Sequence, residues 1–458
     1  MPKKGEWPVD PQEEVPVSQD RIWIDGCFDF FHHGHAGAML QARRLGNELL
    51  VGLHSDEAIL ENKGPTVMNL KERVAAIDAC RWVSRVIPYA PYVTTLPWVS
   101  HYGCWYVAHG DDITSDASGE DCYRFVKRAG RFKVFKRTPG ISTTDLVGRM
   151  LLCTKTHFIK NLDKVLAGEE GPGSESDRKA AGDEMKLRIK EYATAECGRD
   201  PFAEVWSWHP SNRPHSRSSA SSSTHGRRRS SGEHHRHHHH HHMRDDPGSF
   251  SKWVSGQGPR EGQPIVYLDG GFDLFNPGHI EFLKSVNAVE DDAYVVAGIY
   301  NDEVINNVKG VNYPIMNIFE RGLCVLQCKY IHAVVFNAPY TPTQSYLNSL
   351  PYGLPSAVYH EPASFVQLPN HDPHMFSKEM GIYREVPPPQ SEYVGADGIV
   401  DRILKSRAMY EERQRVKGVK GLGEEAVRKR EIMEEEAKQM RLKGLERRWS
   451  EVERSYGA

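Results

Sequence analysis

Two histidines near the start of the chain have the spacing of a phosphate-binding pair. His32 and His35 lie in the segment His32-His33-Gly34-His35, shortly after the apolar segment Arg21-Ile22-Trp23-Ile24, which has the pattern of a buried strand. A strand, a tight turn and a helix N-terminus direct free backbone N–H groups and the positive end of the helix dipole towards an anion. Two imidazoles aimed at one place could bind a phosphoryl group and stabilise the charge that develops during its transfer. A histidine pair in a loop, taken alone, is more often structural.

A second polar cluster lies further along the chain. The segment Arg137-Thr138-Pro139-Gly140-Ile141-Ser142-Thr143-Thr144 places a cation, a glycine and three hydroxyls at the start of an expected helix. This combination suits the β- and γ-phosphates of a nucleoside triphosphate, whereas an ordinary capped helix would explain the hydroxyls but not also Arg137 and Gly140. Lys63, in a loop expected after a strand, could close over phosphates or be a surface lysine. Arg81 and Arg85 could reach the same site or pair on a helix surface.

The elements that must position these residues alternate along the chain. Apolar runs predict strands at 21–24, 49–54, 105–108 and 132–135, and helical periodicity predicts helices at 36–45, 70–82, 122–129 and 146–153. Alternation of strands and helices is typical of a parallel α/β sheet, which binds its ligands at the carboxyl ends of the strands. The sequence therefore predicts a Rossmann-like domain.

The chain contains this domain twice. The segment from Asp25 to His35 returns as Asp269 to His279, an offset of 244, and three later landmarks return in the same order. We therefore predict two tandem Rossmann-like nucleotidyltransferase domains with parallel sheets, a disordered linker and a charged C-terminal helix. The expected boundaries are 1–19 (N-terminal tail), 20–155 (catalytic domain), 156–262 (linker, with low-complexity Ser, Arg and His at 213–244), 263–405 (second, degenerate domain) and 406–458 (charged helical tail).

Composition excludes several classes of protein. The 458 residues include 58 basic and 61 acidic side chains, so no overall positive field indicates a nucleic-acid partner. Eight cysteines are too few for a disulfide scaffold, and none has zinc-ribbon spacing. No apolar run approaches the length of a membrane span, and the N-terminus lacks a signal-peptide core. We expect a cytoplasmic protein, in which His237 to His242 form part of a low-complexity tract that could bind Zn²⁺ or Ni²⁺ incidentally.

At these motifs the chain resembles the cytidylyltransferases of phospholipid synthesis. The segment 32–35 matches their HxGH signature and 137–144 matches their RTxGIST signature. The segment 81–86 is similar to their third motif, but Ser84 and Arg85 stand where the family has Asp and Glu. The resemblance covers roughly residues 20–155 and 263–405, and the tandem arrangement is that of the members that act on phosphoethanolamine. Members that act on phosphocholine have one catalytic domain followed by a membrane-binding helix.

The resemblance implies that the phosphate of phosphoethanolamine attacks the α-phosphorus of CTP, with Mg²⁺ bound to the leaving pyrophosphate. His32, His35 and Lys63 would then be the catalytic residues. The implied CTP-binding residues are Gly26, Cys27, Phe28, Gly34, His109, Gly110, Asp111, Asp112, Arg137, Gly140, Ile141, Ser142, Thr143 and Thr144. For the substrate amine we predict Asp25 and Tyr92, with Arg81 nearby, because a carboxylate suits a primary ammonium. No metal site made of protein ligands is expected.

The second copy lacks this chemistry. The segment Asn276-Pro277-Gly278-His279 has lost the first histidine, and nothing corresponds to the hydroxyl run at 142–144, so we predict a folded but inactive partner. In the tail, Leu442, Leu445, Trp449 and Val452 form one helical stripe, which could pack on the second domain or contact a membrane surface such as that of the endoplasmic reticulum. A homodimer, an enzyme for phosphocholine and a non-catalytic nucleotide-binding scaffold all remain open.

Overall fold

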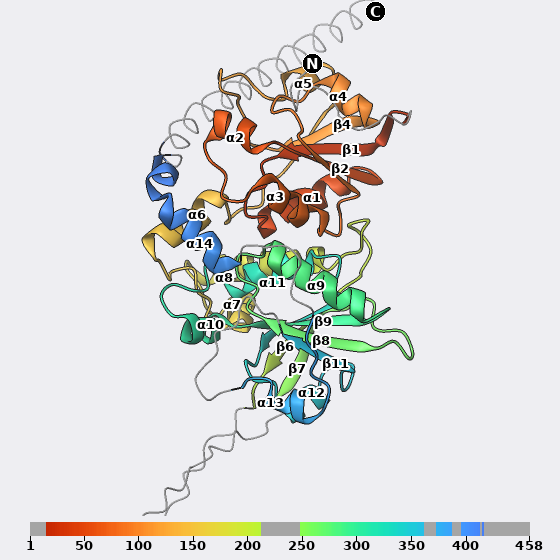
Figure 1. The fold of residues 1–458 in the computed structure, drawn as a ribbon, viewed down its shortest axis with the longest axis vertical. Helices are drawn as coiled ribbons and strands as arrows, with labels where there is room; N and C mark the ends of the chain where they lie inside the picture. Colours follow the sequence, from red (N-terminus) through yellow and green to blue (C-terminus); the bar gives the residue numbers. More distant parts are fainter. Residues whose placement is uncertain (1–14, 212–247, 361–371, 387–394, 413–414, 416–458) are drawn as a thin grey trace, which may run out of the picture.

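The computed structural model describes residues 15–211, 248–360, 372–386, 395–412 and 415. Its first half is built on a five-stranded parallel sheet with the strand order β3-β2-β1-β4-β5 (Figure 1). The strands are β1 (Ser18–Gly26), β2 (Glu48–Leu53), β3 (Arg85–Pro88), β4 (Cys104–Gly110) and β5 (Phe132–Phe135). In β1 the consecutive residues Ile22, Trp23 and Ile24 are all buried, as expected for a parallel strand covered on both faces.

Helices of the first half cover both faces of this sheet. They are α1 (His33–Arg43), α2 (Asp56–Lys63), α3 (Leu70–Asp78), α4 (Leu96–His101), α5 (Arg124–Arg128) and α6 (Thr143–Leu152). The short elements α2, β3 and α4 were not expected from the sequence. Lys63 ends α2 rather than lying in an open loop, and Gly64, at φ +93°, terminates that helix in a backbone conformation that favours glycine.

The second half repeats the architecture, which confirms the predicted α/β fold. Its sheet has the order β11-β8-β9-β10-β6-β7. The repeated strands are β8 (Ile265–Gly270), β9 (Tyr294–Tyr300), β10 (Ala333–Ala338) and β11 (Ala357–His360). The helices are α9 (Pro277–Val289), α10 (Asp302–Lys309), α11 (Ile318–Leu326), α12 (Gln344–Asn348), α13 (Met375–Glu379) and α14 (Ala396–Lys405).

The prediction of a linker over 156–262 is wrong for much of that range. It contains α7 (Leu162–Ala167), α8 (Glu175–Tyr192), β6 (Glu204–His209) and β7 (Ser249–Val254). Strand β6 pairs parallel to β10 and β7 pairs antiparallel to β6, so the second sheet is extended and is not purely parallel. The charged surface of α8 concealed it, because only Gly182, Ile189 and Tyr192 of its residues are buried. The low-complexity tract 213–244 lies outside the described residues.

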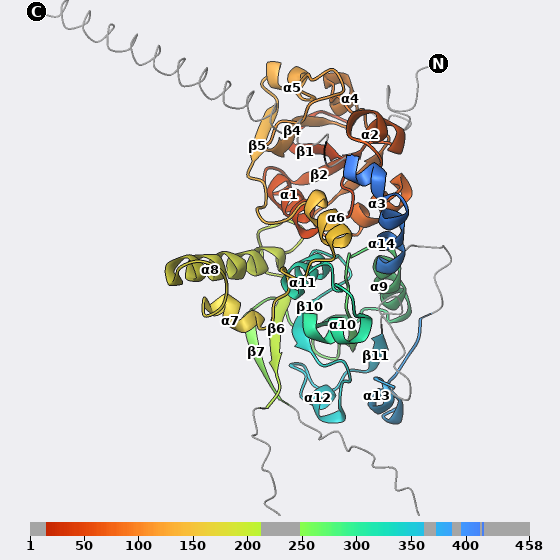
Figure 2. The same cartoon turned by 90° about the vertical axis from the view of Figure 1, so that its left-hand side faces the viewer.

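The two halves pack against each other through their helices. Helix α1 contacts α11, α3 contacts α9, and α14 runs beside α6, as Figure 2 shows. None of the helices in the described ranges is long and apolar enough to cross a lipid bilayer. The apolar stripe from Leu442 to Val452 falls outside those ranges, so its role stays a prediction.

Candidate active site

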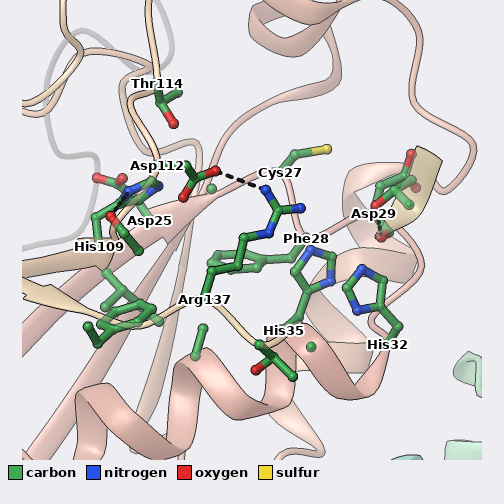
Figure 3. A pocket seen from close by; sticks show the side chains of 18 of the residues that line it. Asp25, Cys27, Phe28, Asp29, His32, His35, His109, Asp112, Thr114 and Arg137 are labelled. Carbon is green, nitrogen blue, oxygen red and sulfur yellow. Dashed lines mark hydrogen bonds and ion pairs between the residues drawn. The ribbon is translucent and has the colours of Figure 1, made fainter. Parts of the chain in front are cut away.

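A pocket of about 270 Å³ opens at the carboxyl ends of β1 and β4 (Figure 3). It is lined by residues from both sequence clusters and from the ends of these strands. The predicted residues among its lining are Asp25, Gly26, Cys27, Phe28, His32, Gly34, His35, Lys63, His109, Gly110, Asp112, Arg137, Ile141 and Thr143. An open groove beside it is lined by Asp111, Gly140 and Ser142, together with Arg137 and Ile141. The structure therefore brings almost all of the predicted site together.

The two histidines face the pocket as a stacked pair. Their ring centroids lie 3.8 Å apart with an angle of 17° between the rings, and Phe28 packs edge-on against His35 at 5.4 Å. His32 occupies the N-cap position of α1, but its imidazole does not cap the helix. Both side chains therefore sit at the positive end of α1, where an anion is favoured.

The turn between β1 and α1 is fixed by residues that sequence reasoning did not single out. The fully buried Arg73 donates a hydrogen bond of 2.8 Å to the carbonyl of Cys27 and forms an ion pair with Asp56. The carboxylate of Asp29 accepts hydrogen bonds from the backbone N–H groups of Val67 and Met68, both at 2.9 Å. These contacts tie the turn to the segment that follows Lys63, so the histidines and the lysine are positioned by one network.

Gly34 lies where the turn approaches the second motif most closely. A Cβ atom at this position would lie 2.7 Å from Cγ2 of Ile141 and 2.9 Å from Nδ1 of His32. Gly34→Ala should therefore displace the histidine pair, and we expect kcat to fall by roughly 100-fold, since small misplacements of catalytic groups have effects of that size. Steady-state kinetics with a melting curve would test this. Near-normal kcat in the folded variant would show that the close approach is not needed.

Arg137 faces the histidines across the pocket, as Figure 3 shows. Its guanidinium donates to Asp112 at 3.1 Å, and its backbone N–H donates to Asp111 at 3.1 Å. The ion pair is about half exposed, so it is weak and can be exchanged for a phosphate contact. Gly140, at φ +81°, turns the chain into α6, and the Ser142 hydroxyl caps that helix by accepting from the N–H of Asp145.

Lys63 and Tyr92 lie together at the other side of the pocket. The Lys63 ammonium lies 5.9 Å from the centroid of the Tyr92 ring. Tyr92 packs against His54 with ring centroids 5.0 Å apart and does not itself line the pocket. Tyr92 therefore lies beside the lysine and outside the pocket lining, and its contact with the substrate amine stays a prediction.

Asp25 is a buried carboxylate held by neutral donors. It accepts hydrogen bonds from Trp23 Nε1 at 2.7 Å, the Thr94 hydroxyl at 2.5 Å and the Tyr123 hydroxyl at 2.7 Å. Burial, together with the adjacent Asp25, raises the pKa of Tyr123, so this phenol remains a donor. The ring of His109 packs against Tyr123, and burial lowers the pKa of His109. Thr94 and Tyr123 were missed because they lie far from Asp25 in sequence.

Besides Tyr92, two further predicted residues lie away from the pocket lining. Arg81 is buried between the halves, where its guanidinium donates to the carbonyls of Thr194, Cys328 and Ile331 and lies over the ring of Phe202. The prediction that Arg81 binds substrate is corrected, because its donors are directed to backbone carbonyls of the other half. Thr144 lies in the first turn of α6, outside the residues that line the pocket and the groove.

Further lining residues complete the pocket. They were not predicted as site residues, although Thr138 lies within the segment 137–144: Ile24, Asp29, Ala38, Asn62, Ala108, Ile113, Thr114, Phe135 and Thr138. Most of them are neighbours in sequence of a predicted residue, which is the one signal that could have found them.

Comparison with known proteins decides the family. A family model described as cytidylyltransferase-like matches residues 23–149 and again residues 267–435. An ethanolamine-phosphate cytidylyltransferase of Mus musculus is 37% identical over 403 residues, which cover 88% of this chain and 90% of that protein. The chain belongs to the ethanolamine-phosphate cytidylyltransferase family. A second relative with that name, from Dictyostelium discoideum, is 37% identical over 402 residues and covers 87% of this chain. Choline-phosphate cytidylyltransferase A of Rattus norvegicus is 39% identical over only 159 residues, 34% of this chain.

In the second half, the residues that remain of the HxGH-like segment make hydrogen bonds within the start of α9. Asn276 caps α9: its side chain accepts from the Gly278 N–H at 2.9 Å and donates to the Leu274 carbonyl at 2.9 Å. His279 accepts the Asn276 N–H through Nδ1 at 3.2 Å and is almost completely buried. The Asn276 side chain and His279 Nδ1 are thus held within the helix start instead of facing a ligand.

The lysine of the second half that corresponds to Lys63 is paired with a carboxylate. Lys309, the counterpart of Lys63, lies 3.3 Å from the carboxylate of Asp397. Asp397 stands in the first turn of α14, whereas the first turn of α6 carries Thr143 and Thr144 beside Asp145. A carboxylate there neutralises the lysine and repels a phosphate. The geometry supports the predicted inactivity of this half.

Each half contributes one arginine that pairs with a buried glutamate of the other half. Arg149 of α6 makes two hydrogen bonds to Glu320 of α11, at 2.7 and 2.9 Å. Arg402 of α14 makes two hydrogen bonds to Glu72 of α3, at 2.8 and 2.9 Å. Helix α6, which follows the segment 137–142, is therefore anchored on the second half.

Removing the acid of the first pair tests this anchoring. Glu320→Ala leaves Arg149 buried with Asp145 as its remaining carboxylate partner, so we expect the free energy of unfolding to fall by about 3 kcal/mol. We also expect the KM for CTP to rise, because α6 loses its anchor. Urea unfolding and initial rates would measure both effects. A variant with unchanged stability and KM would show that the second half does not position α6.

Proposed function

We propose that this protein transfers the cytidylyl group of CTP to phosphoethanolamine, giving CDP-ethanolamine and pyrophosphate. The observation that carries the proposal is the pocket itself, in which the stacked His32 and His35 at the start of α1 face Arg137 across the lining. The family supports the same reaction, because its ethanolamine-phosphate members match nearly the whole chain.

The reaction is an in-line displacement at the α-phosphorus. A phosphate oxygen of phosphoethanolamine forms a bond to the α-phosphorus of CTP, and the bond to the β-phosphate oxygen breaks, releasing pyrophosphate. Such transfers need positioning and charge stabilisation more than covalent chemistry. His32 and His35 would stabilise the charge on the transferred phosphoryl group, and Lys63 would neutralise the phosphates of both substrates. Arg137 and the start of α6 would hold the β- and γ-phosphates.

The carboxylate of Asp25 supports the choice of an amine. Trp23, Thr94 and Tyr123 solvate its charge but do not neutralise it, since all three donors are uncharged. A carboxylate has capacity for about four hydrogen bonds, so one position remains for an ammonium N–H. A quaternary choline head has no N–H to donate, and an aromatic cage would suit it better.

Mg²⁺ would enter with CTP as part of the substrate. Among the described residues, no group of three His, Cys, Asp or Glu side chains with metal-ligand spacing lies in this pocket. This fits Mg²⁺, which keeps several waters and binds mainly through substrate phosphates. Its charge would assist departure of pyrophosphate, while Lys63 and Arg137 hold the phosphates from the protein side.

We also propose that the protein works in the cytoplasm. All eight cysteines are free, and five of them are buried (Cys80, Cys104, Cys122, Cys324 and Cys328). Thiols persist in this state in a reducing compartment. Contact with the surface of the endoplasmic reticulum and formation of a homodimer remain predictions.

The proposed function is tested by pyrophosphate release from CTP and Mg²⁺ with each acceptor alone. We expect rapid release with phosphoethanolamine and little with phosphocholine. Equal use of both acceptors would contradict the role of Asp25 but keep the reaction. No release with either acceptor, from folded protein, would contradict the proposed reaction and favour a nucleotide-binding scaffold.

A further inference from the structure

Three potential metal ligands meet in the second half, outside the catalytic pocket. Asp269 near the end of β8, His360 at the end of β11 and His374 just before α13 have ligand atoms that all lie within 4.8 Å of one another. The His360 and His374 rings have centroids 4.2 Å apart, and His374 stacks on Tyr383 at 5.3 Å. Asp269 and His374 are almost completely buried. The cluster is thus enclosed and built from three separate elements.

The same place in the first half shows what has changed. There Asp25, at the position of Asp269, receives three hydrogen bonds, from Trp23, Thr94 and Tyr123. In the second half Tyr267 replaces the tryptophan, and its hydroxyl pairs with that of Tyr346 instead.

His374 replaces Tyr123, since each of the two residues directly precedes the corresponding short helix, α13 or α5. The position that holds a phenol donor in the first half therefore holds an imidazole in the second half, and an imidazole can ligate a metal. Two of the three hydrogen-bonding positions around the carboxylate have changed in type.

The Asp269 carboxylate has fewer hydrogen bonds than the Asp25 carboxylate. Its Oδ1 contacts His360 Nδ1 at 2.9 Å, whereas its Oδ2 is buried and has no hydrogen-bond partner in the part of the chain that the structure describes. A buried carboxylate oxygen without a partner is costly unless a cation compensates it. Two imidazoles beside a carboxylate are a donor set that suits zinc, whereas Mg²⁺ and Ca²⁺ prefer oxygen ligands alone.

We propose that the second half binds one Zn²⁺ ion through Asp269, His360 and His374. The ion would compensate the buried carboxylate and join β8, β11 and the segment before α13. Three protein ligands leave one position of a tetrahedral site for a further ligand such as water. This site does not depend on the proposed reaction, because it shares no residue with the catalytic pocket.

The experiment must first remove a competing zinc binder. The eight histidines between positions 234 and 242 would themselves bind Zn²⁺, so all eight are replaced by serine in the full chain. This protein is loaded with Zn²⁺ alone, dialysed against metal-free buffer and analysed for metal content. Loading with Co²⁺ instead gives a visible absorption spectrum that reports tetrahedral coordination. We expect one retained equivalent of zinc and a tetrahedral cobalt spectrum.

The decisive variant is His374→Tyr, in the same background. It restores the residue found in the first half, whose hydroxyl can donate to the buried carboxylate, so the fold should survive without metal. We expect it to lose the zinc equivalent and the cobalt spectrum while its melting temperature without metal does not fall. His360→Gln is expected to lose the metal as well. Absence of retained zinc in the parent, or equal retention in His374→Tyr, would overturn the proposal.

Discussion

Replacement of His35 by alanine is expected to lower kcat by roughly 10³-fold, the range found when a charge-stabilising group is removed from a transition state. His35 stacks on His32 at 3.8 Å and is held by Phe28, so its ring has a fixed direction into the pocket. The alanine variant removes the donor but leaves the helix start, because the backbone N–H of His35 still bonds to the His32 carbonyl. Steady-state kinetics with CTP and phosphoethanolamine would measure the loss.

The matched control is His279→Ala in the second half. His279 packs on Phe275 and accepts the backbone N–H of Asn276, so its loss should lower stability by about 1–3 kcal/mol while kcat of the folded protein is retained. We therefore expect His35→Ala to lower kcat and His279→Ala to leave it nearly unchanged, although the two histidines occupy equivalent positions. Similar losses of kcat in both variants would mean that the second half takes part in catalysis.

Replacement of Lys63 by methionine is expected to lower kcat/KM by roughly 10²- to 10³-fold. The methionine keeps the apolar stem of the side chain against Tyr92 but removes the charge that neutralises the substrate phosphates. The loss should appear in single-turnover experiments as slower chemistry, in addition to weaker binding of CTP. If the variant binds CTP more weakly but its chemical step has the normal rate, Lys63 contributes to binding and not to the chemical step.

Lys309→Met provides the matched comparison. Lys309 is already paired with Asp397, so its charge is not available to a nucleotide. We expect kcat/KM to change by less than about twofold, since the variant removes only a partly exposed ion pair. A large loss would show that the lysine of the second half also contributes to the reaction.

The motifs predicted the contents of the catalytic pocket well, because the chemistry is concentrated in short segments. The turn at 32–35 and the segment 137–144 each combine a helix start with polar side chains, and such local combinations can be recognised without a structure. The order of repeated landmarks likewise predicted the second half. Patterns within single short segments were therefore sufficient to predict most of the residues that line the pocket.

Contacts between distant segments could not be predicted in this way. Arg81 lies in a segment similar to a family motif. Its guanidinium nevertheless donates to backbone carbonyls that are 113 to 250 positions away in the sequence. Thr94 and Tyr123 hold Asp25 from 69 and 98 positions away. The zinc ligand set was missed for the same reason, since Asp269 and His360 are 91 positions apart.

The folded part of the expected linker was missed for a different reason. Helix α8 is an 18-residue helix with few buried positions, so its sequence lacks a continuous apolar stripe. Its buried end nevertheless matters for the site, because the Tyr192 hydroxyl donates to the backbone carbonyl of His33 at the start of α1. Because its sequence is mostly charged, α8 was not predicted, although it contacts the start of the helix that carries the histidine pair.

The central claim, attack at the α-phosphorus in the pocket of the first half, is tested most directly by following labelled phosphate. CTP labelled at the α-phosphate and CTP labelled at the γ-phosphate are each incubated with phosphoethanolamine and Mg²⁺. We expect the α-label to enter CDP-ethanolamine and the γ-label to leave in pyrophosphate, with both transfers slowed by roughly 10³-fold in His35→Ala. Transfer of the γ-label to the acceptor, or α-label transfer at an undiminished rate in His35→Ala, would contradict attack at the α-phosphorus in this pocket.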